Sequence, residues 1–446
     1  MTDYSHKKFG LISLGCDKNR VDAEKLLAQI VARGCEITND ISGAQVLIIN
    51  TCSFLEDARR EAIDTIIECA SYKQSGVLEK LVVTGCLPQK FIGELYDELT
   101  EADVFLGTYD YDKFFEALER AYAEGRCNMV GTGENPFTCA RVITTPLHYA
   151  YLKIADGCNN RCTYCLIPKI RGGYFSYPME KLLEEAESLG DVAELIVVAQ
   201  DVTRYGIDLY GQKKLCELLQ KLTALDNINS VRLLYCYPEM IDDELIALVA
   251  QNPKIIKYLD IPFQHSEDRV LKMMNRRGTR NSYLGLVKKL REEIPGIAIR
   301  STFICGFPTE TEEESAALGS FLREAQLDNC GFFAYSREEG TPAYKIKGQI
   351  PATVKRRRVK EMYAVQREIS LNKLKAHVGK QLKVLCDGIS EENGCFCGRS
   401  YFQAPDIDGK VLFNSPFAEQ GRYYDVLITG CDSYNLYGRT EDYSDE

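Results

Sequence analysis

The sequence predicts an α/β protein with three parts: an N-terminal domain built on a parallel sheet, a central barrel of β and α units, and a small C-terminal antiparallel β-barrel. Two patterns predict this fold. As far as about residue 335, short β-branched runs alternate with amphipathic stretches, which is typical of βαβ units. After Gly379 the chain changes to short β-rich runs separated by turns, as in small barrels.

The N-terminal domain is expected over residues 1–125. Its strands are predicted at 9–14, 45–50 and 81–84, and each is followed by a helix-like segment. The clearest helix, 21–33, ends before Gly34, which suits a C-terminal cap. Residues 126–148 contain glycine and proline with little periodicity, so they are predicted to form a linker.

The central barrel is expected over residues 149–377. Helical segments separate six strand-like runs, at 149–155, 194–199, 231–236, 257–262, 297–304 and 330–335. Such units predict an open or closed (β/α) barrel, in which reactive residues lie where strands end. A long helix over 351–377 completes this domain. The small barrel is expected over 378–446, with strands at 381–386, 394–398, 410–413 and 424–429.

Length and composition exclude several classes of protein. The 446 residues suit two to four domains at roughly 100 to 200 residues each. No apolar run approaches the roughly 18 residues of a membrane span, and residues 1–8 lack the apolar core of a signal peptide. A cytoplasmic protein without membrane contact is therefore expected. Because the cytosol keeps thiols reduced, 18 Cys against 4 His favour thiolate-bound metal over disulfides or a His-rich zinc site.

The net charge of -11 is unevenly distributed. The segment 355–375, inside the long helix, carries eight basic and two acidic residues, and its simplest interpretation is a solvated helix face. Residues 380–446 carry six basic and twelve acidic residues, a net charge of -6. The small barrel is therefore predicted to repel phosphate.

The sharpest motif is a C-x3-C-x2-C loop formed by Cys158, Cys162 and Cys165, directly after the first barrel strand. Three thiolates on one loop can hold three corners of a cubane iron-sulfur cluster and leave one iron open. A structural zinc site normally needs a fourth Cys or His, and the next cysteine is Cys216. Zinc and chance clustering remain the alternatives.

A second set of cysteines is dispersed: Cys16, Cys52 and Cys86 each lie two residues beyond a predicted strand end. Ends of parallel strands share one sheet edge, where ligands bind in α/β folds, so these thiols could converge. Single cysteines near strand ends are equally often small buried hydrophobes. The other twelve are interpreted as packing residues, including Cys35, Cys69, Cys216, Cys236, Cys305, Cys330, Cys386 and Cys431, with Cys395 and Cys397 as a weak metal candidate.

Over nearly its whole length the chain resembles the radical S-adenosylmethionine (SAM) methylthiotransferases. The resemblance rests on SLGCDKNRVDAE at 13–24, on the three-cysteine loop with Tyr164 before its last cysteine, and on the terminal barrel. The branch that modifies a ribosomal protein is favoured over the tRNA-modifying branch by the following stretches: DIPFQH at 260–265, IRSTFI at 299–304 and GRSYFQAPDIDG at 398–409. Two positions depart from the pattern, Thr309 in place of a usual Gly and Tyr177 in place of a usual Arg.

This resemblance implies an auxiliary-cluster domain, a radical SAM (β/α)6 partial barrel and a C-terminal TRAM domain. It implies that Cys158, Cys162 and Cys165 hold the 4Fe-4S cluster that cleaves SAM, and that Cys16, Cys52 and Cys86 hold an auxiliary 4Fe-4S cluster. One SAM would provide the methyl group and another the radical. The implied target is the β-carbon of an aspartyl residue in ribosomal protein number twelve of the small subunit.

The implied partners are this ribosomal protein, an external electron donor and a sulfur donor, with nucleic-acid contact secondary. A tRNA methylthiotransferase acting on an adenosine beside the anticodon and a non-catalytic iron-sulfur scaffold are the alternatives. Three further residues are predicted to line the SAM or substrate pocket, because they follow barrel strands. They are Gln200 and Asp201 after the second strand and His265 after the fourth, although His265 could equally be structural.

Overall fold

The computed structural model describes residues 4–133, 138–392 and 394–443. The chain divides into two compact units. Unit 1 comprises Met1–Thr144, Ala155–Arg161 and Cys165–Ser188, and unit 2 comprises Thr145–Ile154, Cys162–Tyr164 and Leu189–Glu446. This division cuts across the boundary expected near residue 148, because most of the segment after the first barrel strand packs with the N-terminal residues. Residues 134–137 of the expected linker lie outside the described residues.

Unit 1 is built on a six-stranded parallel sheet in the order β2-β1-β3-β4-β5-β6. Its strands are β1 (Lys8–Ser13), β2 (Glu36–Ile37), β3 (Val46–Thr51), β4 (Lys80–Gly85), β5 (Val104–Phe105) and β6 (Cys127–Asn128). The three predicted strands are confirmed as β1, β3 and β4. The other three have two residues each, too few to produce a periodic signal. Since β6 pairs with β5, the start of the expected linker belongs to the sheet.

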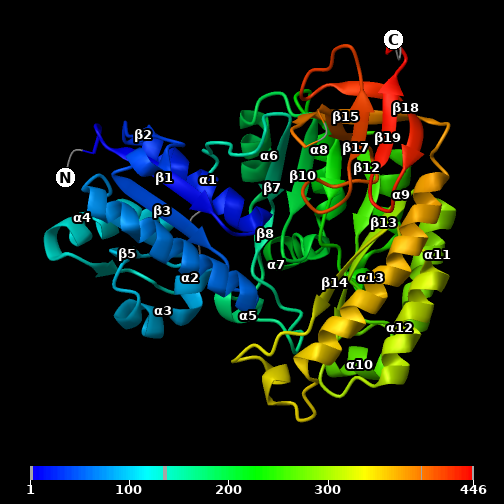
Figure 1. The fold of residues 1–446 in the computed structure, drawn as a ribbon, viewed down its shortest axis with the longest axis horizontal. Helices are drawn as coiled ribbons and strands as arrows, with labels where there is room; N and C mark the ends of the chain where they lie inside the picture. The colour runs from blue at the N-terminus through cyan, green and yellow to red at the C-terminus, as the bar shows by residue number, and fades with distance from the viewer. Residues whose placement is uncertain (1–3, 134–137, 393, 444–446) are drawn as a thin grey trace. The chain divides into compact units, whose positions relative to one another are not determined.

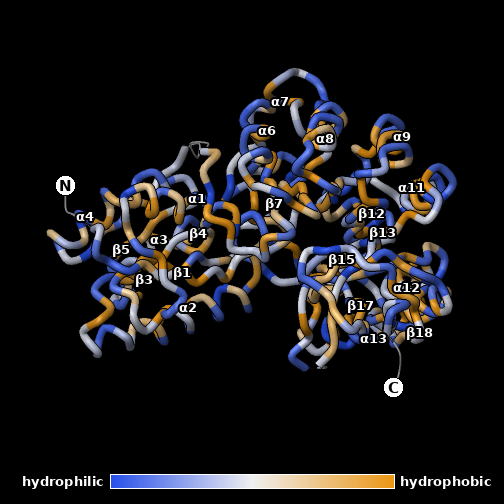
Figure 2. Tube along the Cα trace, turned by 90° about the horizontal axis from the view of Figure 1, so that it is seen from above, coloured by the Kyte–Doolittle hydropathy of each residue, from blue (hydrophilic) through white to orange (hydrophobic). Residues whose placement is uncertain are grey.

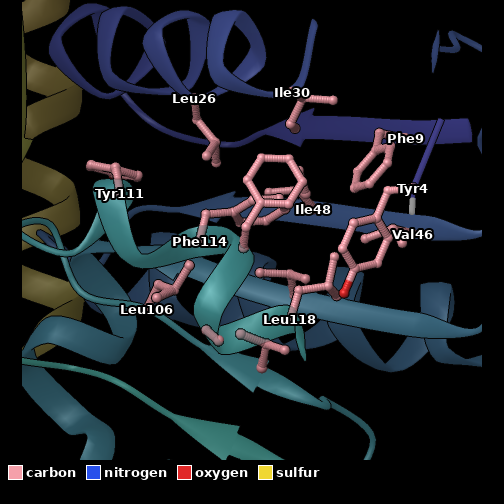
Figure 3. Close-up of a cluster of buried hydrophobic side chains, with 14 of the residues drawn as sticks. Tyr4, Phe9, Leu26, Ile30, Val46, Ile48, Leu106, Tyr111, Phe114 and Leu118 are labelled. Atoms are coloured by element: carbon pink, nitrogen blue, oxygen red, sulfur yellow. The ribbon is translucent and has the colours of Figure 1, made fainter. Parts of the chain in front are cut away.

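Helices α1 (Asp17–Ala32), α2 (Glu56–Ala70), α3 (Cys86–Glu98) and α4 (Phe114–Glu124) pack on this sheet (Figure 1). Unit 1 also contains α5 (Ile167–Ile170) and α6 (Met179–Ser188), with 3-10 turns at Ile41–Gly43, Ser71–Ser75 and Tyr111–Lys113. Helix α1 ends as predicted, because Gly34 adopts a φ of +75° and its N–H donates to the carbonyl of Val31. Figure 3 shows Phe114 and Leu118 of α4 packed with Phe9, Ile48 and Leu26.

Unit 2 contains the predicted barrel strands as one parallel sheet in the order β14-β13-β12-β11-β10-β7, an open partial barrel. These strands are β7 (Tyr149–Lys153), β10 (Glu194–Val198), β11 (Val231–Leu233), β12 (Ile255–Asp260), β13 (Ala298–Cys305) and β14 (Asn329–Ala334). All six predicted strands are therefore confirmed. The short strands β8 (Ala155–Asp156) and β9 (Phe175–Ser176) form a separate antiparallel pair in unit 1.

Helices lie between the barrel strands. They are α7 (Ile207–Tyr210), α8 (Leu215–Ala224), α9 (Asp243–Gln251), α10 (Asp268–Met273), α11 (Arg280–Glu293) and α12 (Glu312–Ala325), with 3-10 turns at Val202–Arg204, Pro238–Met240 and Pro342–Lys345. In Figure 2 the traces of α9 and α11 change between hydrophilic and hydrophobic colours along their turns, the pattern of amphipathic helices. None of the helices in the described parts of the chain is long and apolar enough to cross a membrane.

The last part of unit 2 is the helix α13 (Ala352–Lys375) followed by a closed five-stranded barrel in the order β15-β16-β17-β19-β18. The strands are β15 (Gln381–Ser390), β16 (Cys395–Arg399), β17 (Val411–Asn414), β18 (Tyr423–Cys431) and β19 (Leu436–Thr440). Four of them and α13 are confirmed predictions. The fifth, β19, was missed because Gly438 and Arg439 break its apolar alternation.

A buried group of charges joins this barrel to the parallel sheet within unit 2. Glu194, at the start of β10, lies 2.5 Å from Arg232 of β11 and 2.6 Å from Arg399 of β16. Arg399 also pairs with Asp387 at 2.9 Å, and Asp387 lies 2.8 Å from the Nε2 atom of His148. Because ion pairs are costly to bury unless each charge has a partner, this network favours one placement of the small barrel on the sheet.

Candidate active site

The structure brings Cys16, Cys52 and Cys86 to one edge of the unit 1 sheet. They follow β1, β3 and β4, which are neighbours in the sheet. Burial raises the pKa of the Cys52 thiol to about 12, and the neighbouring thiols of Cys86 and Cys16 raise it further in the same direction. The predicted convergence of these strand ends is therefore seen in the fold, and the three thiols are within electrostatic reach of one another.

Two asparagines and a glycine shape this edge. The side-chain amide of Asn19 donates to the carbonyl of Thr51 at 3.0 Å, and that of Asn50 donates to the carbonyl of Asn19 at 2.7 Å. Gly85 adopts a φ of +97°, and a Cβ atom there would lie 2.5 Å from the carbonyl oxygen of Thr51. Any larger residue would push Cys86 away from the edge. Sequence reasoning missed these residues, although each lies within three positions of a cysteine.

The second set, Cys158, Cys162 and Cys165, lies on the loop between β8 and α5, and all three side chains are half-buried. The backbone N–H of Asn160 donates to the sulfur of Cys158 at 3.5 Å, and that of Ile167 donates to the sulfur of Cys165 at 3.4 Å. Hydrogen bonds to sulfur of this kind stabilise thiolates and tune iron-sulfur clusters.

Within unit 1, Arg171 connects Cys86 of the first set to Asp156, two residues before Cys158. Its buried guanidinium donates through Nη1 to Asp22 at 2.6 Å and to Asp156 at 3.0 Å, and through Nη2 to the sulfur of Cys86 at 3.7 Å and to the side chain of Asn19. Burial disfavours its charged form, but Asp156 and the other acceptors overcome this and raise the pKa of Arg171 well above its ordinary value. A cation is thus held between the loop that carries Cys158 and the sheet edge that carries Cys16, Cys52 and Cys86. We call this edge the auxiliary edge.

Comparison with known proteins identifies the family. Residues 152–322 match the radical SAM superfamily, residues 378–440 match the TRAM domain, and residues 8–107 match a family described as uncharacterized protein family UPF0004. Ribosomal protein uS12 methylthiotransferase RimO from Lachnoclostridium phytofermentans is 46% identical over 97% of this chain and 100% of its own length. The chain belongs to the RimO family of methylthiotransferases.

A second RimO relative, from Pelotomaculum thermopropionicum, is 48% identical over 97% of this chain and 99% of its own. Among solved structures, the radical S-adenosylmethionine methyltransferase TsrM from Kitasatospora setae aligns with a TM-score of 0.56 at 14% identity, covering 76% of this chain and 74% of that one. At this identity the likeness concerns the fold, and it confirms the predicted radical SAM architecture.

RimO-family enzymes are radical SAM methylthiotransferases that use two 4Fe-4S clusters and SAM. The cysteines of this chain suit such clusters in two respects: each set offers three sulfur donors, and backbone N–H groups already donate to two of the loop thiols. Within the described residues, no three His, Cys, Asp or Glu side chains are placed to hold one metal ion. A cubane differs from such a site, because its thiolates each bind a separate iron.

The three predicted pocket residues have other contacts in the structure. Asp201 is buried, caps the 3-10 turn Val202–Arg204 and accepts from the N–H of Thr203 at 3.1 Å. His265 is fully buried: its Nδ1 accepts from the N–H of Glu267 at 3.1 Å, and its Nε2 lies 3.6 Å from Glu310. Gln200 is half-buried beyond the end of β10. A role of these residues in binding SAM or substrate stays a prediction.

The two departures from the family pattern have distinct environments. Thr309 adopts a φ of +68°, a conformation that costs a residue with a Cβ atom roughly 1–2 kcal/mol, which explains the usual glycine. Tyr177 is buried beside β9, and the ammonium of Lys25 lies 5.5 Å from its ring centroid. An arginine at position 177 would place a second cation beside Lys25.

Proposed function

We propose that this protein adds a methylthio group to the β-carbon of an aspartyl residue of ribosomal protein uS12. In this proposal Cys158, Cys162 and Cys165 hold the cluster that cleaves SAM, and Cys16, Cys52 and Cys86 hold the auxiliary cluster. The observation that carries the proposal is the similarity to uS12 methylthiotransferases along the whole chain, with both cysteine sets in place.

The protein residues would position the reacting groups rather than perform the difficult chemistry. The bound cofactors supply a radical able to take hydrogen from an unactivated carbon, together with the sulfur placed there. The chain contributes the thiols and the N–H groups of Asn160 and Ile167 that donate to them. Gly157, at a φ of +71°, lets the loop return closely, since a Cβ atom there would lie 2.1 Å from the carbonyl oxygen of Gly173.

The surface of the TRAM barrel supports a basic protein as the substrate. Asp387 and Asp408 form ion pairs with Arg399 and Arg300, so part of the acidic surplus is neutralised. An acidic excess still remains among the exposed side chains of the described barrel: Glu391, Glu392, Asp406, Glu419, Asp425, Glu441 and Asp442 against Lys380, Lys383, Lys410 and Arg422. Such a surface attracts a basic ribosomal protein and repels phosphate.

A direct competition of substrates tests this assignment. We expect anaerobically reconstituted enzyme, supplied with reductant, SAM and sulfide, to add a methylthio group to a peptide copying the target loop of uS12. A tRNA anticodon hairpin in the same reaction should stay unmodified. Mass spectrometry of both products provides the measurement. A methylthio mass gain on the hairpin alone would replace the proposed substrate by tRNA.

The reaction also defines the remaining partners. Reductive cleavage of SAM consumes an electron, and each methylthio group consumes a sulfur atom, so we infer an external electron donor and a sulfur donor. A ribosomal substrate places the enzyme in the cytoplasm.

We infer that any contact with nucleic acid occurs through one face of α13. Arg357 and Arg358, on another face, form ion pairs with Glu312 of α12. Arg356, Lys360 and Arg367 instead are exposed at helical spacing and line a groove of about 360 Å³ together with half-buried Tyr363. No acidic side chain of the described residues lines this groove. A basic stripe with an aromatic ring suits a single-stranded RNA backbone, such as ribosomal RNA near the substrate.

The salt dependence of RNA binding tests this face. Each phosphate neutralised contributes about 0.7 to the slope of log K against log salt concentration for single strands. We therefore expect the triple variant Arg356→Gln, Lys360→Gln, Arg367→Gln to bind a short unstructured RNA more weakly, with a slope reduced by about 2. Fluorescence anisotropy at several salt concentrations measures the RNA affinity and its salt dependence. Arg357→Gln is the matched control and should leave the slope unchanged; an equal loss in both variants would contradict a role for this face.

A further inference from the structure

Arg171 is the buried group whose surroundings the proposed reaction leaves unexplained. Its side chain is 2% exposed, and its guanidinium contacts residues from three separate segments of unit 1. Asp22 and Asn19 belong to α1, Asp156 ends β8 two residues before Cys158, and Cys86 opens α3. A buried arginine is stable only when its donors are satisfied, and here one of its acceptors is a sulfur.

We propose that Arg171 is a positioning residue that ties the auxiliary edge to the SAM-cleaving loop and raises the reduction potential of the auxiliary cluster through its bond to Cys86. The inference rests on the proposed function, because it takes Cys86 as a cluster ligand. A reduced cluster carries one more negative charge than an oxidised one, so a nearby cation that donates to a ligand sulfur favours the reduced form.

The geometry requires arginine rather than lysine. One terminal nitrogen of Arg171 serves the carboxylates of Asp22 and Asp156, while the other serves Cys86 and Asn19. A planar fork can hold partners in two directions at once, whereas an ammonium on a flexible stem acts as a point charge. Lysine would keep a positive charge here but lose part of the connection between the two cysteine loops.

The chain around Arg171 is shaped to hold it in place. Helix α5 directly follows the loop, and its Ile170 packs with Leu166 against Cys86 in one buried cluster. The N–H of Cys158 donates to the carbonyl of Gly172 at 3.2 Å, which returns the loop to the residue after Arg171. A shift of Arg171 would therefore displace both Cys86 and Cys158.

A purely structural arginine would give a different result, and Arg141 provides the comparison. Its side chain is also 2% exposed in unit 1, but its carboxylate partners are Glu24 and Glu185. Both Arg171→Gln and Arg141→Gln leave buried carboxylates short of a cation, so both should lower thermal stability. Only Arg171→Gln should lower the reduction potential of the auxiliary cluster.

The experiment uses the full chain with Cys158, Cys162 and Cys165 replaced by alanine, so that only the auxiliary cluster forms. Arg171→Gln, Arg171→Lys and Arg141→Gln are added singly, and each protein is reconstituted anaerobically and titrated with reductant under electron paramagnetic resonance. For Arg171→Gln we expect the ratio of reduced to oxidised cluster at a fixed potential to fall at least tenfold, equivalent to about 59 mV for one electron. The reduction potential of the Arg171→Lys cluster should lie between those of Arg171→Gln and the parent. The potential of the Arg141→Gln cluster should equal that of the parent.

Equal potentials in Arg171→Gln and Arg141→Gln would overturn the inference. If Arg171→Gln does not fold, Arg171→Lys keeps the charge and decides the question, since a potential equal to the parent's would also overturn it. Failure of the parent itself to bind about four irons would instead overturn the ligand assignment in the proposed function. The two failures are therefore distinguishable.

Discussion

Replacing Cys158, Cys162 and Cys165 together with alanine is expected to abolish formation of 5′-deoxyadenosine from SAM. The wild-type chain should bind about eight irons, as two four-iron cubanes, and the variant about four. SAM is cleaved only at an iron that keeps an open position, which the three-cysteine loop provides and the replacement removes. The three loop thiols are only half-buried, so the variant should keep its fold.

The measurement combines iron analysis with chromatographic detection of 5′-deoxyadenosine. Replacing Cys16, Cys52 and Cys86 with alanine is the reciprocal experiment, which should keep SAM cleavage but lose methylthio transfer. Cys395→Ala with Cys397→Ala is the control and should retain both clusters. Zinc in place of iron, or unchanged cleavage in the first variant, would contradict the radical SAM assignment and favour a non-catalytic scaffold.

Much of the fold could be predicted from sequence because its signals are local. Strands of the partial barrel such as β10 and β13 contain β-branched runs, while β7 and β14 are rich in aromatic residues. Helical segments separate these strands, and local patterns detect both kinds of element. The two-residue strands β5 and β6 have no periodicity of their own. They exist because neighbouring backbone in the folded sheet offers hydrogen-bond partners, which no local pattern reports.

The residues of the candidate site also divide into those that a local motif reveals and those that only the fold brings together. Cys158, Cys162 and Cys165 could be found because their spacing is a local motif, and Cys16 could be linked to Cys86 only through the predicted order of strands. Arg171 could not be found, because its partner Asp22 lies 149 residues away in sequence. Of the eight individually named packing cysteines, six are buried as predicted, while Cys330 and Cys431 are half-buried.

Replacing Glu194 should have a large effect on the stability of unit 2. Glu194→Gln is expected to lower the free energy of unfolding of unit 2 by about 3–5 kcal/mol, because it leaves Arg232 and Arg399 buried without their shared carboxylate. Burial alone would raise the pKa of Glu194, but the two arginines outweigh it and hold the pKa below the ordinary value of 4.5. A lowered carboxyl pKa contributes stability that is complete above pH 4.5 and is lost as pH falls through the folded-state value.

Urea unfolding of both proteins across the acid range checks this prediction. The difference between wild type and Glu194→Gln should be largest near neutral pH and shrink below pH 4.5, as Glu194 of the wild type gains its proton. Glu217→Gln is the matched control, because Glu217 also faces two cations, Lys214 and Lys221, but on the exposed surface. Solvent screens these two ion pairs, so Glu217→Gln should change the free energy of unfolding little. Similar losses in the two variants would show that burial of the Glu194 network does not determine its contribution.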